Sequence, residues 1–401
     1  MKTEIITDNI ERAAELIKAG ELVAVPTETV YGLAGNGLCA ETVGMIYEVK
    51  GRPAVKPLAL MVPDSDAMDL YCEDVPEQAK LLADKFWPGP LSIVLRAKST
   101  VPDIVRAGGS TVSLRCPDHS KTLGLLKMTG LPLAAPSANP SSLPSPKNAQ
   151  TVMDYFDGSI AAVIDGGECG IGTESTIIDM SRTPYRILRQ GALPEEKIKK
   201  ALAEKLRLIG ITGGSGCGKT TALKALSDCG ALLIDCDAVY HELLESDEAM
   251  LAELKNEFPK AFSGEKLDRK ALGAEVFSDE NKLLRLNEIT HRHITERLRE
   301  LIGDHAMRGG FIAAIDAVAL IESGLAEYCD RVIGVTADRE KRIERIMRRD
   351  GVSREYAEKR IDAQKSDSFY FENCSVVFEA NADSQTLKNN VINYLEKEEM
   401  I

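Results

Sequence analysis

The sequence predicts an α/β protein of two domains, with a twisted mixed sheet in the first half and a doubly wound parallel sheet in the second. The length of 401 residues suits two domains of about 200 residues each. Short apolar runs alternate with amphipathic stretches, which is the pattern of sheets covered by helices. A charged amphipathic stretch at residues 194–205 precedes a new apolar run, so we place the seam near residues 192–206.

The first half begins with a predicted helix, because residues 8–19 carry apolar side chains at helical spacing up to Gly20. Residues 22–25 then predict a buried strand. Further short apolar runs predict strands of the same sheet, at residues 58–62, 91–95, 112–114, 133–135, 161–164, 176–178 and 187–188. Helical stretches separate several of these runs, which favours a sheet of mixed direction.

The second half shows a more regular alternation of strand and helix patterns. Its strands are predicted at residues 207–211, 231–235, 311–316 and 331–336, with helical stretches between them. Such alternation is typical of a doubly wound parallel sheet.

The composition narrows the class of protein. A formal charge of −13 argues against non-specific binding to nucleic acid or to an anionic membrane. No run approaches the roughly 20 apolar residues that span a bilayer, and the N-terminus does not have the pattern of a signal sequence. The nine cysteines form no CxxC pair and no zinc-ligand spacing. We therefore expect a soluble, cytoplasmic protein.

The sharpest motif is a glycine-rich loop in the second half with the pattern Gly-x-x-x-x-Gly-Lys-Ser/Thr. It consists of Gly213, Gly214, Ser215, Gly216, Cys217, Gly218, Lys219 and Thr220, followed by Thr221. The backbone N–H groups of such a loop wrap ATP phosphates, the lysine reaches the β- and γ-phosphates, and the threonine holds Mg²⁺. A glycine-rich turn with an incidental lysine is the alternative, but a strand precedes this loop and a predicted helix, 218–228, begins within it.

Two aspartates follow at the end of the strand at residues 231–235, the end at which open α/β sheets bind ligands. Strand alternation predicts that Asp235 and Asp237 point to the same side. We expect Asp235 to orient Mg²⁺ and Asp237 to take a proton from an acceptor hydroxyl. Asp237 also suits the N-cap of a helix predicted at residues 238–245, and capping is compatible with catalysis.

Arg345 and Arg349 lie four residues apart on a helix predicted at residues 338–350, so they share one face. Such a pair suits a lid that clamps phosphates. The alternative is an exposed charged face, because other charged residues surround both arginines.

These motifs, in this order, resemble the dephospho-CoA kinases over residues 206–398. The resemblance also runs through residues 267–272, 276–279, 286–289, His291, 316–322, 345–350 and the segment ending at Gln364. It implies a P-loop kinase that transfers the ATP γ-phosphate to the ribose 3′-hydroxyl of dephospho-CoA, with Asp237 as the base.

Two segments depart from that family. His291 is followed by Arg292 where the family has His-Pro, and residues 316–322 lack the proline of its Asp-x-Pro-Leu-Leu-x-Glu pattern. Losing both prolines alters the backbone near the expected acceptor site. Another acceptor, or a silent nucleotide-binding regulatory module, is therefore the alternative for this half.

The first half has no such loop, and four polar clusters stand out instead. Residues 26–33 offer hydroxyls on a turn after a strand. Three cations follow within seven residues: Lys50, Arg52 and Lys56. Two prolines stiffen this segment, which suits a phosphate site, whereas a solvated basic loop is the alternative.

The other two clusters follow later strands. Alternation points Ser113 and Arg115 to one face, and an arginine suits bidentate recognition of a carboxylate. Residues 135–142 open from a strand end into hydroxyls and an amide, including Ser137 and Asn139. Taken alone, this last cluster is a turn.

With segments 87–91, 174–176 and 188–191, these clusters resemble the YrdC family of threonylcarbamoyl-AMP synthases over residues 8–194. The resemblance implies that L-threonine, bicarbonate and ATP form threonylcarbamoyl-AMP and pyrophosphate, with Mg²⁺ accompanying ATP. The product would pass to a tRNA-modifying threonylcarbamoyl transferase. Strong direct binding of tRNA is not expected, because the net charge is negative.

The resemblance also implies roles for single residues. Lys50, Arg52 and Lys56 would neutralise the phosphates, with Lys50 and Arg52 as catalytic groups. The nucleotide would be lined by Ser137, Asn139, Ser145 and Arg189, and threonine would be held by Thr27, Tyr31, Arg115 and Ser175. We therefore expect a YrdC-like domain at residues 1–194, a linker helix at 195–205 and a dephospho-CoA kinase-like P-loop domain at 206–401.

Overall fold

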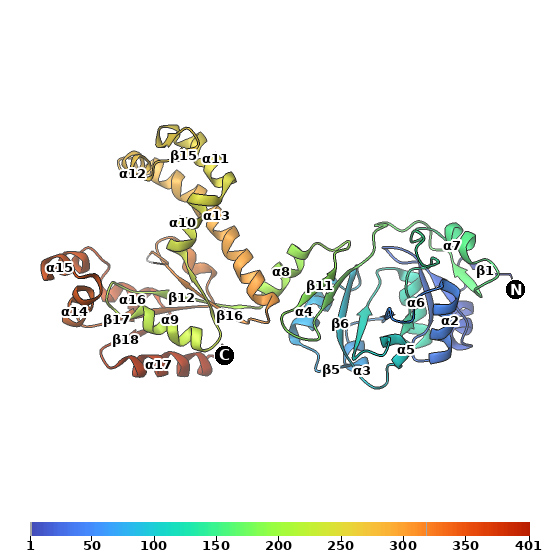
Figure 1. Cartoon of the computed structure of the whole chain (residues 1–401). Coiled ribbons are helices and arrows are strands. Elements are labelled where there is room, and N and C mark those ends of the chain that lie inside the picture. Colours follow the sequence, from blue (N-terminus) through green and yellow to red (C-terminus); the bar gives the residue numbers. More distant parts are fainter. Residues whose placement is uncertain (1, 318) are drawn as a thin grey trace. The chain divides into compact units, whose positions relative to one another are not determined.

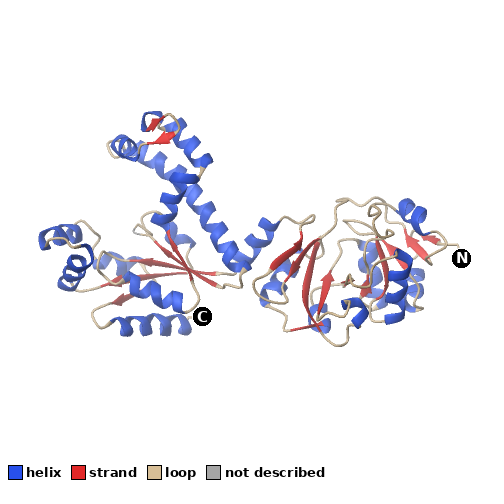
Figure 2. Ribbon diagram, in the orientation of Figure 1, coloured by secondary structure: helices blue, strands red, loops and turns tan. Residues whose placement is uncertain are grey.

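The computed structural model describes residues 2–317 and 319–401. The chain divides into two compact units (Figures 1 and 2). The N-terminal unit extends to Leu202 and includes Met307–Gly309, and the C-terminal unit comprises Ala203–Ala306 and Gly310–Ile401. Val318, in the segment 316–322 where the acceptor pattern is altered, lies outside the described residues.

The N-terminal unit is built from strands and helices that alternate irregularly. Its strands are β1 (Glu4–Ile6), β2 (Val23–Val25), β3 (Gly32–Asn36), β4 (Ala59–Met61), β5 (Cys72–Glu73), β6 (Leu91–Ala97), β7 (Thr111–Arg115), β8 (Leu133–Ala134), β9 (Ala162–Ile164), β10 (Thr176–Asp179) and β11 (Arg186–Arg189). Its helices are α1 (Ile10–Lys18), α2 (Ala40–Lys50), α3 (Ala67–Tyr71), α4 (Glu77–Phe86), α5 (Asp103–Arg106), α6 (Ser120–Thr129), α7 (Ala149–Phe156) and α8 (Glu195–Ala203).

These strands form an 11-stranded sheet in the order β1-β9-β2-β3-β8-β4-β7-β6-β10-β11, with β5 beside β6. Four pairs, β1/β9, β2/β9, β4/β7 and β6/β10, are parallel. The remaining pairs are antiparallel. The predicted mixed sheet is therefore confirmed, although strands β1, β3 and β5 were not predicted.

Helix α1 shows why this chain folds as the pattern suggests. The Asn9 side chain accepts a hydrogen bond from the backbone of Arg12 and so caps the first turn. Gly20 follows the helix with a φ of +87°, a conformation that favours glycine. The apolar face of α1 packs with α6 against strands β2 and β9, burying side chains such as Ile17 and Val23 completely.

The C-terminal unit contains the remaining elements. Its strands are β12 (Arg207–Thr212), β13 (Leu232–Asp235), β14 (Phe262–Ser263), β15 (Lys266–Leu267), β16 (Ile312–Asp316), β17 (Arg331–Thr336) and β18 (Val376–Glu379). Its helices are α9 (Lys219–Asp228), α10 (Cys236–Ser246), α11 (Glu248–Glu257), α12 (Arg269–Val276), α13 (Glu280–Met307), α14 (Arg339–Asp350), α15 (Arg354–Asp362), α16 (Asp367–Asn373) and α17 (Ser384–Lys397), with 3₁₀ turns η1 (Pro259–Ala261) and η2 (Leu325–Tyr328).

Its main sheet has the order β13-β16-β12-β17-β18, and every pair in it is parallel. The predicted parallel sheet is confirmed, although β18 and the β14–β15 hairpin were not predicted. Helices α9 and α17 lie together on one side of the sheet (Figure 1), and their apolar side chains form a core with β12 and β17. The central strand β12 therefore delivers the glycine-rich loop from a rigid base.

The segment between the two sheets differs from its prediction. Helix α8 ends at Ala203 and buries Ile198, Ala201 and Leu202, so it is shorter than the linker helix expected at residues 195–205. Across the described residues, no helix is both long enough and apolar enough to cross a membrane.

Candidate active sites

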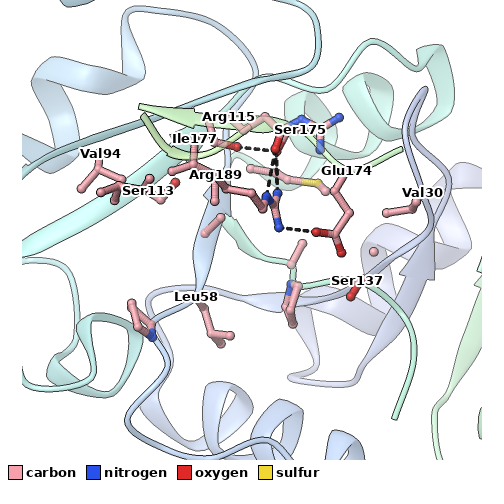
Figure 3. A pocket seen from close by; sticks show the side chains of 18 of the residues that line it. Val30, Leu58, Val94, Ser113, Arg115, Ser137, Glu174, Ser175, Ile177 and Arg189 are labelled. Carbon is pink, nitrogen blue, oxygen red and sulfur yellow. Dashed lines mark hydrogen bonds and ion pairs between the residues drawn. The ribbon is translucent and has the colours of Figure 1, made fainter. Parts of the chain in front are cut away.

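The N-terminal unit contains a cavity of about 320 Å³, lined by residues of β3, β4, β6, β7, β10 and β11 and of the loops beside them. Its lining includes three arginines, Arg52, Arg115 and Arg189, and one carboxylate, Glu174. Figure 3 shows Arg115, Arg189 and Glu174. Ser137 and Ser175 add hydroxyls, and Leu58, Val94 and Ile177 give it an apolar wall. The cavity is thus suited to an anionic ligand with an apolar portion.

Arg115 reaches the cavity from the end of β7, as alternation along this strand predicts. Its Nη2 donates to Glu28 Oε1 and to Thr29 Oγ1, both at 2.8 Å, and its Nε donates to the Gly89 carbonyl at 3.3 Å. Of the three side-chain nitrogens of Arg115, only Nη1 has no hydrogen-bond partner within the described residues. Bidentate recognition of a carboxylate by Nη1 and Nη2 of Arg115 would therefore require Glu28 or Thr29 to release the Nη2 group.

Glu28 is a functional candidate to which the sequence reasoning gave no role. Its second oxygen, Oε2, accepts a hydrogen bond from the backbone of Asp118 at 3.1 Å, so both carboxylate oxygens have partners. Its side chain is 12% exposed and that of Arg115 is 8% exposed. A buried guanidinium needs such a counterion, and this requirement is the one sequence signal that could have identified Glu28.

Arg189, on β11, is held by the segment at residues 174–176. Its Nη1 pairs with Glu174, and its Nε and Nη2 donate to the Ser175 carbonyl at 3.1 and 2.8 Å (Figure 3). Ser145 donates to the other oxygen of Glu174 at 3.1 Å, and the Ser175 hydroxyl meets that of Ser92 at 2.9 Å. Ser145 itself lies outside the cavity lining, whereas Ser175 and Arg189 belong to it.

The three clustered cations separate in the structure. The ammonium of Lys50 is buried and donates to the carbonyls of Ser137 and Asn139, so it braces the turn after β8 and does not line the cavity. Burial lowers its pKa to about 8. Arg52 lines the cavity and is fixed by the carbonyls of Lys56 and Pro57, whereas the Lys56 side chain is exposed and outside the lining.

Other predicted site residues build the walls. The Thr27 hydroxyl accepts from the backbone N–H groups of Thr29 and Val30, which folds the turn that carries Glu28. Tyr31 lines the cavity, but its hydroxyl donates to the Gly167 carbonyl at 2.8 Å, and burial raises its pKa to about 12. Asn139 is buried and donates to the carbonyls of Pro140 and Leu143. Thr27 and Asn139 therefore act on the backbone of the site in this structure.

The C-terminal unit has its own cavity, of about 460 Å³, around the glycine-rich loop. The loop joins β12 to α9, and a Cβ at Gly213 would lie 2.3 Å from the Val335 carbonyl oxygen, so only glycine fits there. Gly216 and Gly218 have φ of +76° and +106°. The Lys219 ammonium donates to the Gly213 carbonyl at 2.8 Å, which holds the cation at the rim where a phosphate would sit. The predicted loop residues that line the cavity are Gly214, Ser215, Gly216, Gly218, Lys219 and Thr220. Cys217 is buried, and Gly213 and Thr221 lie outside the lining.

Helices α14 and α15 place four arginines on this cavity: Arg345, Arg348, Arg349 and Arg360. Arg345 donates to the carbonyls of Gly216 and Ala380, and Arg349 pairs with Asp350 at 2.6 Å.

Helix α14 also carries Arg342, which is buried and contacts the glycine-rich loop from inside the protein. Its Nε donates to the Ser215 carbonyl at 3.0 Å and its Nη2 donates to Gln364 at 2.7 Å. Gln364 in turn accepts from the backbone of Ser215 and donates to its hydroxyl. Arg342 and Gln364 thus tie the loop to α14 and to the end of α15. Because the contacts of Arg342 and Gln364 with Ser215 span more than 100 residues, no local pattern predicted them.

The two aspartates do not share a strand face, and this part of the prediction is wrong. Helix α10 begins at Cys236, so only Asp235 ends the strand and Asp237 lies in the first helical turn. Asp235, and not Asp237, is the N-cap, accepting from the backbone of Ala238 at 3.0 Å.

A third carboxylate completes this end of the sheet. Asp316, the register partner of Asp235 on β16, lines the cavity beside Lys219. Burial raises the pKa of Asp316, and the Lys219 cation opposes that shift. Thr220, Asp235 and Asp316 offer the hard oxygen donors that Mg²⁺ prefers, so the residues present fit that ion.

The altered acceptor segments have a structural consequence. Arg292 lies inside the continuous helix α13, where it pairs with Glu253. A proline at this position would interrupt the helix, and arginine lets it continue. Burial lowers the pKa of the neighbouring His291.

Comparison with known proteins agrees with this two-unit organisation. Residues 15–191 match the Sua5/YciO/YrdC family model, described as "Telomere recombination", and residues 207–386 match the model described as "Dephospho-CoA kinase". The chain is 46% identical over 195 residues to a threonylcarbamoyl-AMP synthase of Pyrococcus abyssi, covering 49% of this chain and 57% of the relative. The same name is carried by a Bacillus subtilis protein, 43% identical over 194 residues, covering 48% of this chain and 56% of the relative.

The chain thus spans little more than half the length of these two relatives. A Bos taurus threonylcarbamoyl-AMP synthase is 36% identical over 197 residues, which cover 47% of this chain and 70% of that protein. Residues 207–386 match the dephospho-CoA kinase family model, and through its N-terminal unit the chain belongs to the Sua5/YciO/YrdC family.

Proposed function

We propose that the chain is a bifunctional enzyme with one nucleotide site in each unit. The N-terminal unit would join L-threonine, bicarbonate and ATP into threonylcarbamoyl-AMP and pyrophosphate, and the C-terminal unit would phosphorylate the 3′-hydroxyl of dephospho-CoA with ATP. We assign these activities to residues 1–194 and 206–401, joined by residues 195–205. The observation that carries the proposal is that each unit has its own cavity lined by arginine guanidinium groups and hydroxyls.

In the N-terminal unit, chemistry proceeds without a covalent enzyme intermediate. The neutral threonine amine attacks the carbon of bicarbonate. An N–C bond forms, the C–OH bond breaks, and the departing hydroxide takes the proton that the nitrogen releases and leaves as water. An oxygen of the resulting carbamate attacks the ATP α-phosphorus, and the bond to pyrophosphate breaks. Every group that gains negative charge is an oxygen, so fixed cations are the main catalytic requirement.

The roles of the predicted residues follow from where they lie. Arg52 and Arg189 reach the cavity and would neutralise the phosphates, with Ser137 beside them. Arg115 would hold the threonine carboxylate through its Nη1, and Ser175 would contact the same substrate. Lys50, which braces the carbonyls of Ser137 and Asn139, supports the nucleotide wall as a positioning residue.

Ser145, Thr27, Tyr31 and Asn139 shape these walls in the same way. Lys56 is exposed, so it would act on a phosphate only after the loop that carries it moves. Mg²⁺ accompanies ATP in this proposal and adds charge neutralisation when it is bound.

In the C-terminal unit, the loop from Gly213 to Thr221 would hold the ATP phosphates. Lys219 would neutralise the β- and γ-phosphates, and Arg345 and Arg349 would close on them from α14. Thr220 and Asp235 would hold Mg²⁺. Asp237 would take the proton of the acceptor hydroxyl as the γ-phosphorus–oxygen bond forms. Asp316 is a second candidate for that proton, because it lines the cavity and burial raises its pKa.

One observation favours an alternative for this unit. The missing prolines at residues 291–292 and 316–322 change the segments expected to meet the acceptor, while the phosphate loop is complete. The C-terminal unit could then phosphorylate another hydroxyl compound, or bind nucleotide as a silent regulatory module.

The test is to assay both reactions on the whole protein with Mg-ATP. We expect ADP formation on adding dephospho-CoA and pyrophosphate release on adding threonine and bicarbonate. Lys219→Ala should abolish the first signal and leave the second intact. Loss of both signals in that variant would refute independent sites, and pyrophosphate release without dephospho-CoA-dependent ADP would favour the alternative.

The product of the N-terminal reaction would pass to a tRNA-modifying threonylcarbamoyl transferase. Two expectations stay predictions from the sequence: that direct binding of tRNA is not strong, and that the protein is cytoplasmic.

A further inference from the structure

Glu174 is the only carboxylate among the residues that line the N-terminal cavity. A carboxylate facing a site for an anionic nucleotide repels that ligand, unless a cation lies between the two. Glu174 therefore needs a reason to be there beyond holding one arginine.

The surroundings of Glu174 are the residues proposed for the nucleotide. Arg189 pairs with one of its carboxylate oxygens (Figure 3), and Ser145 donates to the other. Its negative charge also reaches Lys50 and Arg52, opposing the lowering of their pKa values by burial. The neighbours of Glu174 thus belong to the phosphate side of the site, and Arg115, proposed for threonine, has Glu28 as its own counterion.

The charge of the lining leaves room for a metal ion. Three guanidinium groups and one carboxylate give a net charge of +2 (3 − 1), and Glu28 offsets part of that at Arg115. A triphosphate carries more negative charge than this lining neutralises. A dication bound with the nucleotide would supply the difference and would turn the Glu174 carboxylate from a repulsive group into a ligand.

The donor set suits Mg²⁺ in particular. This ion is commonly bound by one or two carboxylates together with substrate phosphates and water. In the part of the chain that the structure describes, no group of three or more His, Cys, Asp or Glu side chains is placed to hold a metal ion. The remaining ligands in this cavity would therefore have to come from the nucleotide and from water.

We propose that Glu174 is the protein ligand of the Mg²⁺ that enters the N-terminal site with ATP. The inference rests on the proposed nucleotide-binding function of this unit. The proposal competes with two other roles for the carboxylate. Glu174 could occupy Arg189 until the phosphates displace it, or it could be the counterion of the threonine ammonium group.

The test compares ATP binding with and without metal in the whole protein. All variants are made in a Lys219→Ala background, the parent protein. This substitution weakens ATP binding at the glycine-rich loop, so the ATP binding that is measured belongs to the N-terminal site. ATP affinity is measured by calorimetry in excess Mg²⁺ and in EDTA, without threonine or bicarbonate. Loss of the free Mn²⁺ signal in electron paramagnetic resonance, with and without ATP, measures metal binding directly.

We expect Glu174→Gln to weaken binding of Mg-ATP by about tenfold or more and to leave metal-free ATP binding unchanged or tighter. ATP-dependent uptake of Mn²⁺ should fall in parallel. Glu168→Gln removes the same charge from an exposed position shortly before β10 and should change neither measurement.

The other outcomes each overturn the inference in a distinct way. Equal weakening with and without metal would mean that Glu174 acts only by holding Arg189. Tighter ATP binding both with and without Mg²⁺ would mean that Glu174 only occupies Arg189 until the ATP phosphates displace it. Unchanged ATP and Mn²⁺ binding, together with weaker threonine binding in a separate calorimetric titration, would make it the ammonium counterion. Failure of the parent to bind ATP in either condition would refute the nucleotide site itself.

Discussion

The pair formed by Glu28 and Arg115 offers the sharpest test of how the N-terminal site is held. Glu28→Gln keeps the size of the side chain and one acceptor oxygen, but it removes the charge that neutralises Arg115. The guanidinium would remain buried, with hydrogen bonds to Thr29 and Gly89 and no counterion.

The expected loss of stability follows from burial. The two side chains are only 12% and 8% exposed, and the atoms that join them lie 2.8 Å apart. Removing one partner of a buried pair costs about 3–5 kcal/mol, whereas exposed pairs contribute about 1 kcal/mol or less. Because glutamine still accepts one hydrogen bond, we expect about 3 kcal/mol, which corresponds to a shift of the urea midpoint by about 1 M or more.

The chain provides its own probe for this measurement. Trp87 is the single tryptophan, it lies in the N-terminal unit, and its indole N–H donates to the Leu91 carbonyl. Its fluorescence during urea unfolding therefore reports on this unit and not on the other. Glu168→Gln is the matched control, since it removes a charge at an exposed site of the same unit.

A double-mutant cycle completes the test. Arg115→Met combined with Glu28→Gln removes both charges, so the double variant should be no less stable than Glu28→Gln alone. A loss below about 1 kcal/mol for Glu28→Gln, or additive losses in the cycle, would show that water reaches Arg115 and that Glu28 does not hold it.

Two further predictions concern groups that the structure places behind the cavities. Because the pKa of Lys50 is about 8 in the folded chain and 10.5 in its unperturbed state, the unfolded chain binds more protons between these values. The stability of the N-terminal unit should therefore rise between about pH 8 and pH 10, by up to roughly 3 kcal/mol relative to Lys50→Met. Equal pH slopes of Trp87-monitored unfolding in the two proteins would contradict this. In the C-terminal unit, Arg342→Met should release Ser215 and Gln364 and weaken ATP binding to the kinase site by about tenfold. The effect is measured as dephospho-CoA-dependent ADP formation at different ATP concentrations, with pyrophosphate release as the control. An unchanged ATP requirement would show that the contacts of Arg342 with Ser215 and Gln364 do not support ATP binding.

The sequence predicted the elements whose patterns are local. Strands of the parallel sheet are continuous apolar runs, and the glycine-rich loop is a contiguous motif, so neither depends on distant partners. Strand β3 was missed because its sequence, Gly-Leu-Ala-Gly-Asn, has glycines that weaken a strand pattern. The reason for one of them is tertiary: a Cβ at Gly35 would lie 2.6 Å from Thr42 and 2.9 Å from Leu22.

The charged groups of the sites show a different limit. Alternation along β7 predicted the face on which Arg115 lies, but it did not predict which N–H groups of Arg115 are free to bind a ligand. Glu28, which occupies one of them, is 87 residues away along the chain. Lys50 likewise turns to carbonyls 87 and 89 residues away, because a buried ammonium must find acceptors.

Burial explains why these errors share one direction. A cation close to a cavity but inside the protein must be paired by the protein itself, so part of its hydrogen-bonding capacity is spent before any ligand arrives. Sequence reasoning counts every clustered cation as available to phosphate and so overestimates the charge of the site. In this unit the excess that burial explains amounts to Lys50 and part of Arg115, and Glu174 lowers the total further. Lys56 is outside the lining for another reason, because its side chain is exposed. The smaller net charge is the basis for our proposal that Glu174 binds the Mg²⁺ that accompanies ATP. The sequence alone also predicts Mg²⁺ with ATP, so the property that tests the structure is the loss of this Mg²⁺ dependence in Glu174→Gln.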